Sequence, residues 1–270
     1  MMTERDAQYE GFINTPLLWH DDAIFGLQQF DIPNDARTWL EPESTTDLRL
    51  GILVERFVLD TFRQNKSISI LAENVQIQQG KITVGELDCL LDYNGSQIHV
   101  EIVYKFYLYD ESVGDTELEH WIGPNRNDSL VEKLTKLKEK QLPLLHHPST
   151  KKTLQTLQLE VNHFQQQVYF KAQLFVPLSL NKSFEHVNNT CVIGIYIHLH
   201  ELKGFSNYSF HMPTKMNWLS EVHNQVDWLS YDQFIERIKL LIKKRLSPMC
   251  WIKDPNGALK KCFIVWWDSD

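Results

Sequence analysis

The sequence predicts an α/β (α+β) protein with a core of helix, three-stranded antiparallel or mixed sheet and helix, followed by a C-terminal β-rich extension. Three observations predict this class: an apolar helical stripe from Thr46, three strand-like stretches around an Asn-Gly turn, and a second amphipathic stretch from Ser129. The 270 residues are 43% hydrophobic, which is enough for a packed core and excludes a disordered or collagen-like chain.

The chain is predicted to divide into residues 1–45, a wrapping segment with a short helix at Asp22–Phe30, residues 46–150, the core, and residues 151–270, the extension. The first core helix has apolar residues at steps of three and four, the period of one helix face. That stripe consists of Leu48, Ile52, Glu55, Leu59 and Phe62. Glu55 is therefore a charged residue within an apolar stripe.

Three predicted strands follow, at Ser67–Gln78, Lys81–Tyr93 and Gln97–Leu108. The last two flank Asn94-Gly95, the strongest short sequence signal for a two-residue type I′ hairpin. The turn fixes the register, so that Asp88 faces Glu101.

Alternation along the two strands places Glu86, Asp88, Glu101 and Lys105 on one face. Carboxylates placed opposite each other repel, and a cation offsets that repulsion. Two carboxylates from adjacent strands suit Mg²⁺, and Glu55 can supply a third from the first helix. The alternative is that these charges line a solvent-exposed face of the sheet.

These residues also carry a family resemblance. Gly85-Glu-Leu-Asp88, followed by His99-Val-Glu-Ile-Val-Tyr-Lys105, resembles the PD-(D/E)XK nuclease superfamily. With Lys105-Phe-Tyr-Leu108 and Trp121-Ile-Gly-Pro-Asn-Arg-Asn-Asp128, the chain resembles the bacterial domain-of-unknown-function 1853 family within that superfamily. The resemblance implies a restriction-endonuclease-like core.

The resemblance also implies roles for five residues. Asp88 and Glu101 would bind Mg²⁺ or Mn²⁺, Glu55 would join the metal shell, Lys105 would orient the attacking water, and Gln141 on the second helix would support the site. The expected activity is metal-dependent hydrolysis of nucleic-acid phosphodiester bonds.

One position departs from the family motif, which has its lysine two residues after the glutamate, where this chain has Val103. Lys105 keeps the face but lies about two rises of ~3.3 Å further along the strand. A flexible side chain or a β-bulge can recover part of this distance, Lys133 is a candidate replacement, and Glu86 opposite Val103 is a further carboxylate. The displaced lysine favours the alternative function, a catalytically inactive nucleic-acid-binding or protein-interaction module.

Charge is distributed unevenly along the chain. Residues 1–119 carry 8 Lys and Arg against 22 Asp and Glu, whereas residues 120–270 carry 19 against 13, which gives the net charge of −8. Arg126, Lys133, Lys136, Lys138 and Lys140 form a basic cluster, and Lys239, Lys243, Lys244 and Arg245 form another. Such clusters favour a nucleic-acid partner, with DNA preferred over RNA, although lysines also cover the wet faces of ordinary helices.

The remaining features narrow the function class. No P-loop, dinucleotide-binding or serine-hydrolase motif is present, and the four cysteines have no CxxC spacing. The sequence shows no membrane-spanning stretch, and we expect a cytoplasmic protein with reduced thiols, including a cross-strand pair at Cys250 and Cys262.

The C-terminal part is predicted to hold strands at Val168–Leu178, Thr190–His200 and Asn207–Met212, and a helix at Ser230–Leu246.

Overall fold

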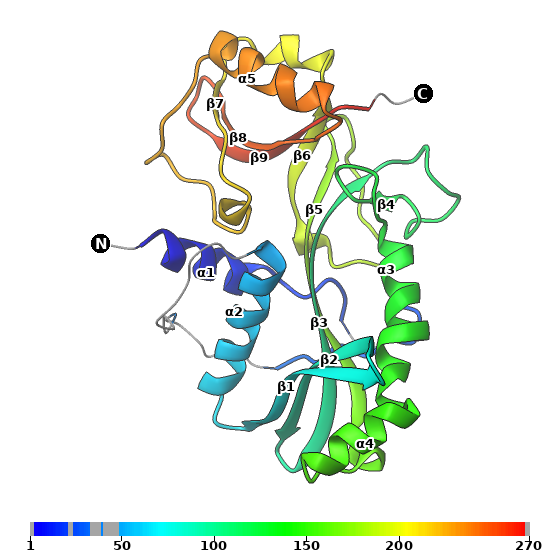
Figure 1. Cartoon of the computed structure of the whole chain (residues 1–270). Coiled ribbons are helices and arrows are strands. Elements are labelled where there is room, and N and C mark those ends of the chain that lie inside the picture. Colours follow the sequence, from blue (N-terminus) through cyan, green and yellow to red (C-terminus); the bar gives the residue numbers. More distant parts are fainter. Residues whose placement is uncertain (1–2, 21–23, 33–38, 40–48, 268–270) are drawn as a thin grey trace. The chain divides into compact units, whose positions relative to one another are not determined.

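The computed structural model describes residues 3–20, 24–32, 39 and 49–267 and shows a mixed α/β protein (Figure 1). Its α-helices are α1 (Glu4–Asn14), α2 (Leu50–Gln64), α3 (Leu130–Lys136), α4 (Pro148–Thr156) and α5 (Tyr231–Lys243). Its strands are β1 (Ile68–Gln79), β2 (Ile82–Tyr93), β3 (Ser96–Tyr109), β4 (Trp121–Ile122), β5 (Gln165–Pro177), β6 (Val192–His198), β7 (Ser209–His211), β8 (Met249–Lys253) and β9 (Leu259–Val265).

The strands of the described residues form one nine-stranded mixed sheet in the order β1-β2-β3-β5-β6-β9-β8-β7, with β4 paired to β3. The pairs β5–β6 and β6–β9 are parallel, whereas β1–β2, β2–β3 and β8–β9 are antiparallel. The three predicted core strands are present as β1, β2 and β3, but they belong to a larger sheet than the predicted three-stranded one. Since an open strand edge presents unpaired backbone groups, the C-terminal strands extend the sheet instead of building a separate one.

The chain divides into two compact units. The first unit comprises Leu17–Tyr104 and Glu132–Lys171, and the second comprises Met1–Pro16, Lys105–Val131 and Ala172–Asp270. Each unit joins segments that lie far apart in the sequence, because β3 and β5 both run from one unit into the other.

The hairpin of β2 and β3 confirms the register that the Asn-Gly turn predicted. Asn94 and Gly95 have φ values of 52° and 86°, and a type I′ turn needs positive φ at both positions. From this turn the ladder continues to Cys89 opposite Val100. The next position along β2 is Asp88, where the candidate site begins.

Helix α2 is present as predicted, but its buried face is rotated from the expected stripe. Residues 46–48, including Leu48, lie outside the described part of the chain. Ile52 is 43% exposed, whereas Leu53 and Phe57 are fully buried. Glu55 is half-buried at the margin of the apolar face rather than inside it.

The N-terminal segment differs from its prediction in two places. Residues 4–14 form α1, whose N-terminus is capped by Thr3 and Asp6, each side chain accepting from the other's backbone N–H. The predicted helix at Asp22–Phe30 is absent from residues 24–30, where Ile24 bridges Leu27 around a turn. Gly26 in that turn has φ of 70°, a conformation that ends any helix.

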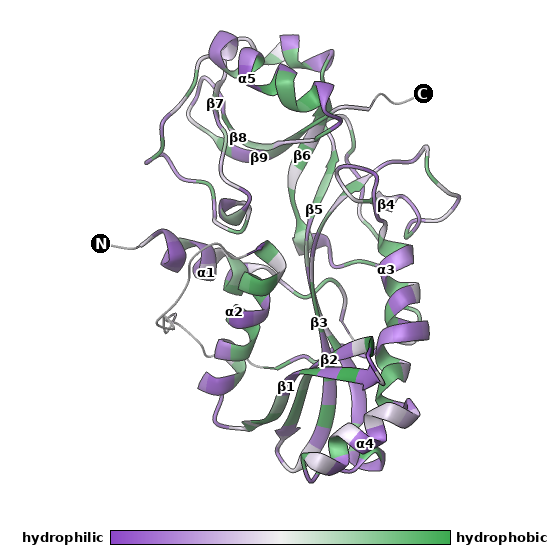
Figure 2. Cartoon of the chain, in the orientation of Figure 1, coloured by the Kyte–Doolittle hydropathy of each residue, from purple (hydrophilic) through white to green (hydrophobic). Residues whose placement is uncertain are grey.

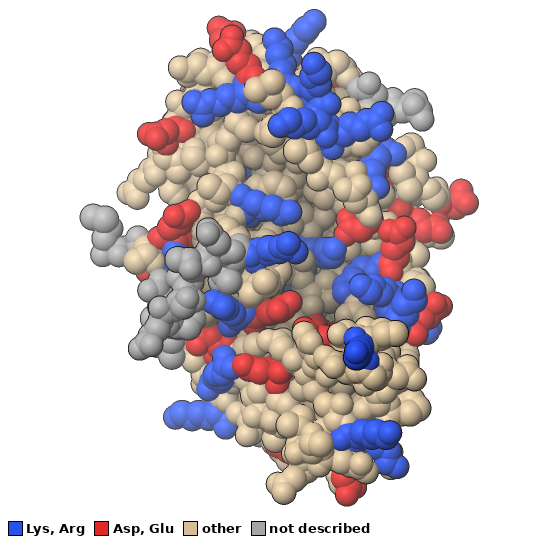
Figure 3. Space-filling view, in the orientation of Figure 1, with Lys and Arg blue, Asp and Glu red and all other residues tan. Residues whose placement is uncertain are grey.

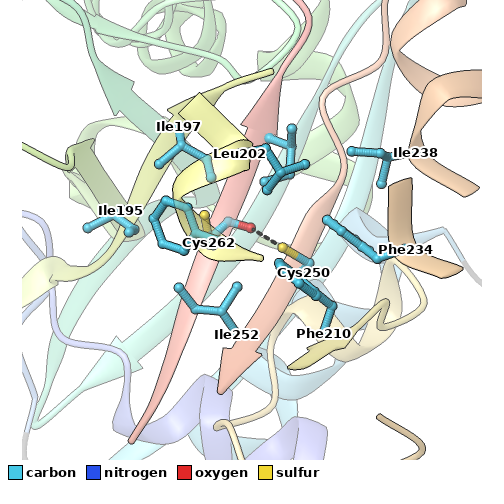
Figure 4. Close-up of a cluster of buried hydrophobic side chains, with 11 residues drawn as sticks. Ile195, Ile197, Leu202, Phe210, Phe234, Ile238, Cys250, Ile252 and Cys262 are labelled. Atoms are coloured by element: carbon cyan, nitrogen blue, oxygen red, sulfur yellow. Dashed lines mark hydrogen bonds between the residues drawn. The ribbon is translucent and has the colours of Figure 1, made fainter. Parts of the chain in front are cut away.

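The second unit confirms the predicted C-terminal elements within a few residues. Helix α5 packs an apolar face that includes Phe234 and Ile238 into a cluster with β6, β8 and β9 (Figure 4). Figure 2 shows both hydrophobic and hydrophilic residues on this helix, as expected of an amphipathic helix with one apolar face. Cys250 faces Cys262 across β8 and β9, and both are buried free thiols, as predicted.

The core of the first unit lies between the β1–β2 hairpin and the chain that follows α3. Its buried members are Ile77, Leu87, Leu90, Leu144, Leu145, Leu154 and Phe164. Gly85 allows close packing there, because a Cβ atom at this position would lie 2.6 Å from Leu144 Cδ2. No helix in the described part of the chain is long and apolar enough to cross a membrane.

Candidate active site

Electrostatic interactions connect four carboxylates of the first unit. Glu55 comes from α2, Glu86 and Asp88 from β2, and Glu101 from β3. Burial and then the negative charges of Glu101 and Glu55 raise the pKa of Asp88, and burial and then the charge of Glu86 raise the pKa of Glu55. We call these four residues the acidic cluster.

Asp88 sits where the β2–β3 ladder stops. Its Oδ2 accepts a hydrogen bond of 2.8 Å from the backbone N–H of Ile102, so a side chain holds β3 just beyond the last backbone pair. Burial raises the pKa of Asp88 from 3.8 to about 7, with a further contribution from Glu101. The Ile102 hydrogen bond and the positive charge of Lys133 act in the opposite direction.

Glu101 is fully buried, and hydrogen bonds engage both of its carboxylate oxygens. Oε1 lies 2.9 Å from Nε2 of His99, which is also fully buried, and Oε2 accepts from Nε2 of Gln141. The alternative interpretation, that this face of the hairpin is exposed to solvent, is therefore wrong for Glu101. A buried carboxylate is tolerated only when it is paired and hydrogen-bonded, and these contacts meet that condition.

His99 is a site residue that the sequence analysis missed. It precedes Glu101 by two residues and therefore shares its face of β3. Its Nδ1 lies 3.5 Å from Nε2 of Gln166 on β5, and that amide also donates to the carbonyl of Leu142. Because a carboxylate only accepts, His99 Nε2 is the donor to Glu101. The spacing of His99 and Glu101 was the available signal.

Gln141 reaches Glu101 from an irregular helix. After α3 the chain forms a π-helical turn, η1 (Leu137–Gln141), followed by a 3₁₀ turn, η2 (Leu142–His146). π-helical turns shift side chains around the helix axis and occur often at functional sites. Oε1 of Gln141 accepts from Lys133 Nζ at 2.6 Å. A continuous chain of contacts thus runs from His99 through Glu101 and Gln141 to Lys133.

Lys105 has a different partner. Its Nζ lies 2.5 Å from Oδ2 of Asp128, and both residues belong to the second unit. Val103, at the position of the family lysine, is 4% exposed. The structure therefore brings Lys133, and not Lys105, into electrostatic contact with Asp88.

The predicted nucleic-acid contacts are also divided between the units. Arg126, in the second unit, pairs with Asp110 and lies 4.2 Å above the Trp267 ring. Lys136 and Lys140 are exposed on α3 and η1 of the first unit. The second basic cluster lies at α5, where Figure 3 shows Lys and Arg side chains gathered at the top of the view.

The donor set of the acidic cluster suits a hard divalent cation. Mg²⁺ typically takes one or two carboxylates as ligands and keeps several water ligands. Asp88 and Glu101 can supply two such carboxylates. Across the described ranges, no three His, Cys, Asp or Glu side chains are arranged to hold one metal ion. Glu55 thus acts on the cluster by its charge, and its role as a third ligand stays a prediction.

Comparison with known proteins identifies the family of this chain but does not identify an activity. The family model described as domain of unknown function (DUF1853) matches residues 18–261. No curated protein and no solved structure matches the chain.

Proposed function

The chain belongs to the DUF1853 family, whose description names no activity, and we propose from the acidic cluster that it is a Mg²⁺- or Mn²⁺-dependent nuclease of the PD-(D/E)XK type. The observation that carries the proposal is Asp88, a half-buried carboxylate with a pKa raised to about 7 by burial and by its neighbours Glu101 and Glu55. Adjacent buried carboxylates are costly without a cation, and strongly shifted groups concentrate at functional sites. The restriction-endonuclease-like core is part of this proposal.

Asp88 and Glu101 would hold the metal ion, which when bound polarises a phosphoryl oxygen and acidifies a water molecule. Hydrogen bonds fix both carboxylates beforehand: Ile102 N–H holds Asp88, while His99 and Gln141 hold Glu101. This rigidity favours a single ligand geometry, which supports catalysis more than a mobile pair of side chains would.

Lys133 takes the place of the family lysine in this proposal. Gln141 accepts from its ammonium group and also donates to Glu101, so one amide links the lysine to a metal ligand. From there Lys133 would orient the attacking water, whose oxygen would form the new bond to phosphorus as the phosphodiester P–O bond breaks. The proton of the water would pass to solvent, and the leaving oxygen would take up a proton from solvent. The exposed Lys136 and Lys140 would contact the phosphate backbone, with DNA favoured over RNA.

One observation favours a second candidate, a nucleic-acid-binding or protein-interaction module without catalysis. Lys105 forms an ion pair with Asp128 and is not a partner of the acidic cluster. If Lys133 cannot replace it, the cluster would bind a cation for structural reasons only.

Cleavage assays test the two candidates. Purified protein with Mg²⁺ or Mn²⁺ is incubated with single- and double-stranded DNA and RNA. We expect D88N and E101Q to abolish cleavage and K133M to lower it by about 10²-fold or more, the scale on which misplacing a reacting group slows an enzyme. K151M is the control, because Lys151 is an exposed lysine of α4 outside the acidic cluster and outside the predicted nucleic-acid contacts.

Titration calorimetry with Mn²⁺ separates the outcomes. The nuclease proposal expects Mn²⁺ binding that D88N and E101Q remove and K133M preserves. Binding without cleavage of any substrate would favour the second candidate. Binding that survives D88N and E101Q would refute the metal site itself.

A further inference from the structure

The second unit contains a cavity of about 340 Å³ whose inner wall includes a buried lysine. Its lining comes from the end of α1, from β5, β6 and β9, and from residues 219–222. This volume lies at the lower end of the range typical of small-ligand sites, about 300–1,000 Å³. All lining residues belong to the second unit, so the cavity is separate from the acidic cluster.

Lys261, on β9, is 5% exposed. Its Nζ donates to Gln173 Oε1 at 2.9 Å and to the carbonyl of Trp218 at 2.6 Å, and lies 3.5 Å from the carbonyl of Leu219. These three acceptors are neutral. Gln173, Leu219 and Lys261 all line the cavity.

The charge of Lys261 lacks a direct counter-ion. None of the described carboxylates forms an ion pair with its ammonium group. Burial lowers the pKa of Lys261 to about 7, and the negative charge of Glu221 has a weaker effect in the opposite direction. The Glu221 carboxylate instead accepts from the side-chain amide of Asn14 at 2.7 Å. A buried charge without an opposite charge is unfavourable, and an anion in the cavity would remove that cost.

The rest of the lining shows what kind of anion fits. Ile193, Leu259 and Val222 supply an apolar wall, and Ile193 is 38% exposed although it is a large aliphatic residue. Among the lining residues, Lys260 adds a second positive charge and Glu221 adds a negative charge. A molecule with one acidic end and an apolar body would satisfy both parts of the cavity.

We propose that this cavity binds a small carboxylate with an apolar body, its acidic group paired with the Lys261 ammonium and its body against Ile193. The proposal is independent of the nuclease function, since it uses no residue of the acidic cluster. The alternative is a purely structural role for Lys261, because its ammonium group also donates to the carbonyl of Trp218, the last residue of the 3₁₀ turn Met216–Trp218.

Ligand-observed NMR with benzoate and benzamide tests the proposal on the full chain. The two probes have nearly the same shape and differ in charge, and hydrogen bonds to charged groups contribute about 1.5–3 kcal/mol. We therefore expect benzoate to bind at least about tenfold more tightly than benzamide. K261M should remove that preference, whereas K243M, at an exposed lysine of α5 outside the cavity lining, should keep it.

A second variant keeps the test decisive if K261M fails to fold. I193W would fill the cavity from its exposed wall without touching Lys261, and we expect it to abolish benzoate binding. Equal binding of benzoate and benzamide, or unchanged benzoate binding in I193W, would overturn the proposal. The absence of saturable binding up to about 10 mM benzoate would also overturn the proposal. That result is expected if the role of Lys261 is purely structural.

Discussion

Replacing Asp88 with Asn should stabilise the metal-free protein above neutral pH, although it removes a hydrogen-bonded side chain. Burial, together with Glu101, raises the pKa of Asp88 from 3.8 to about 7. The folded state therefore holds this proton more tightly than the unfolded chain does. Because the folded state binds more protons between pH 4 and pH 7, the free energy of unfolding falls as pH rises through this window.

The size of the effect follows from the pKa difference. A shift of about three units at 1.36 kcal/mol each corresponds to about 4 kcal/mol of stability lost between pH 4 and pH 8. The uncharged Asn side chain carries no such cost, and its oxygen can still accept from Ile102 N–H. We expect D88N to be about 2–4 kcal/mol more stable than the wild type at pH 8 and nearly equal to it at pH 4.

Urea unfolding in the presence of a chelator, at pH 4, 6 and 8, measures this difference. D92N is the matched control, because Asp92 lies on the same strand and also accepts from a backbone amide, that of Gly95 at 2.8 Å. Mg²⁺ should stabilise the wild type at pH 8 and have little effect on D88N. If D88N were destabilised equally at all three pH values, Asp88 would be an ordinary structural residue and the electrostatic account of the cluster would fail.

Three further predictions concern contacts elsewhere in the fold. H99A should lower the free energy of unfolding by about 3–5 kcal/mol, because it leaves Glu101 buried without one of its partners, and H99Q should recover part of the loss in urea titrations. F234A should cost about 3–5 kcal/mol, since this ring is fully buried and stacks on Phe210 with a centroid distance of 4.2 Å; a loss below about 1 kcal/mol would contradict the packing. G194A should cost about 1–3 kcal/mol or more in thermal unfolding, because its Cβ would lie 2.6 Å from a backbone oxygen, and an unchanged melting temperature would show that β6 is more loosely packed.

Local signals accounted for the hairpin that carries the site. The Asn-Gly turn has one strongly preferred conformation, and alternation then assigns each later residue to a face. Asp88 is thereby predicted to lie beside Glu101, and both lie in the acidic cluster. The same pattern leaves open whether this face is a metal site or is exposed to solvent, because the sequence does not show which other elements cover a strand.

Long-range contacts account for the main differences from the predictions. The lysine near Asp88 is Lys133 and not Lys105, because the π-helical turn at Leu137–Gln141 brings the Gln141 amide between Lys133 and Glu101, whereas Asp128 binds Lys105. A π-helical turn has no dependable sequence signal. The Gln166 contact to His99 likewise comes from β5, which is 67 residues away along the chain.

The sequence by itself determined the α/β class, the β2–β3 register and the carboxylates that meet there, because each depends on interactions between residues close in the chain. Only the tertiary structure decided the size of the sheet, the burial of Glu101, the choice of lysine and the cavity at Lys261. These features depend on which distant segments pack together, and packing is governed by shape, desolvation and hydrogen-bond partners that no local pattern records.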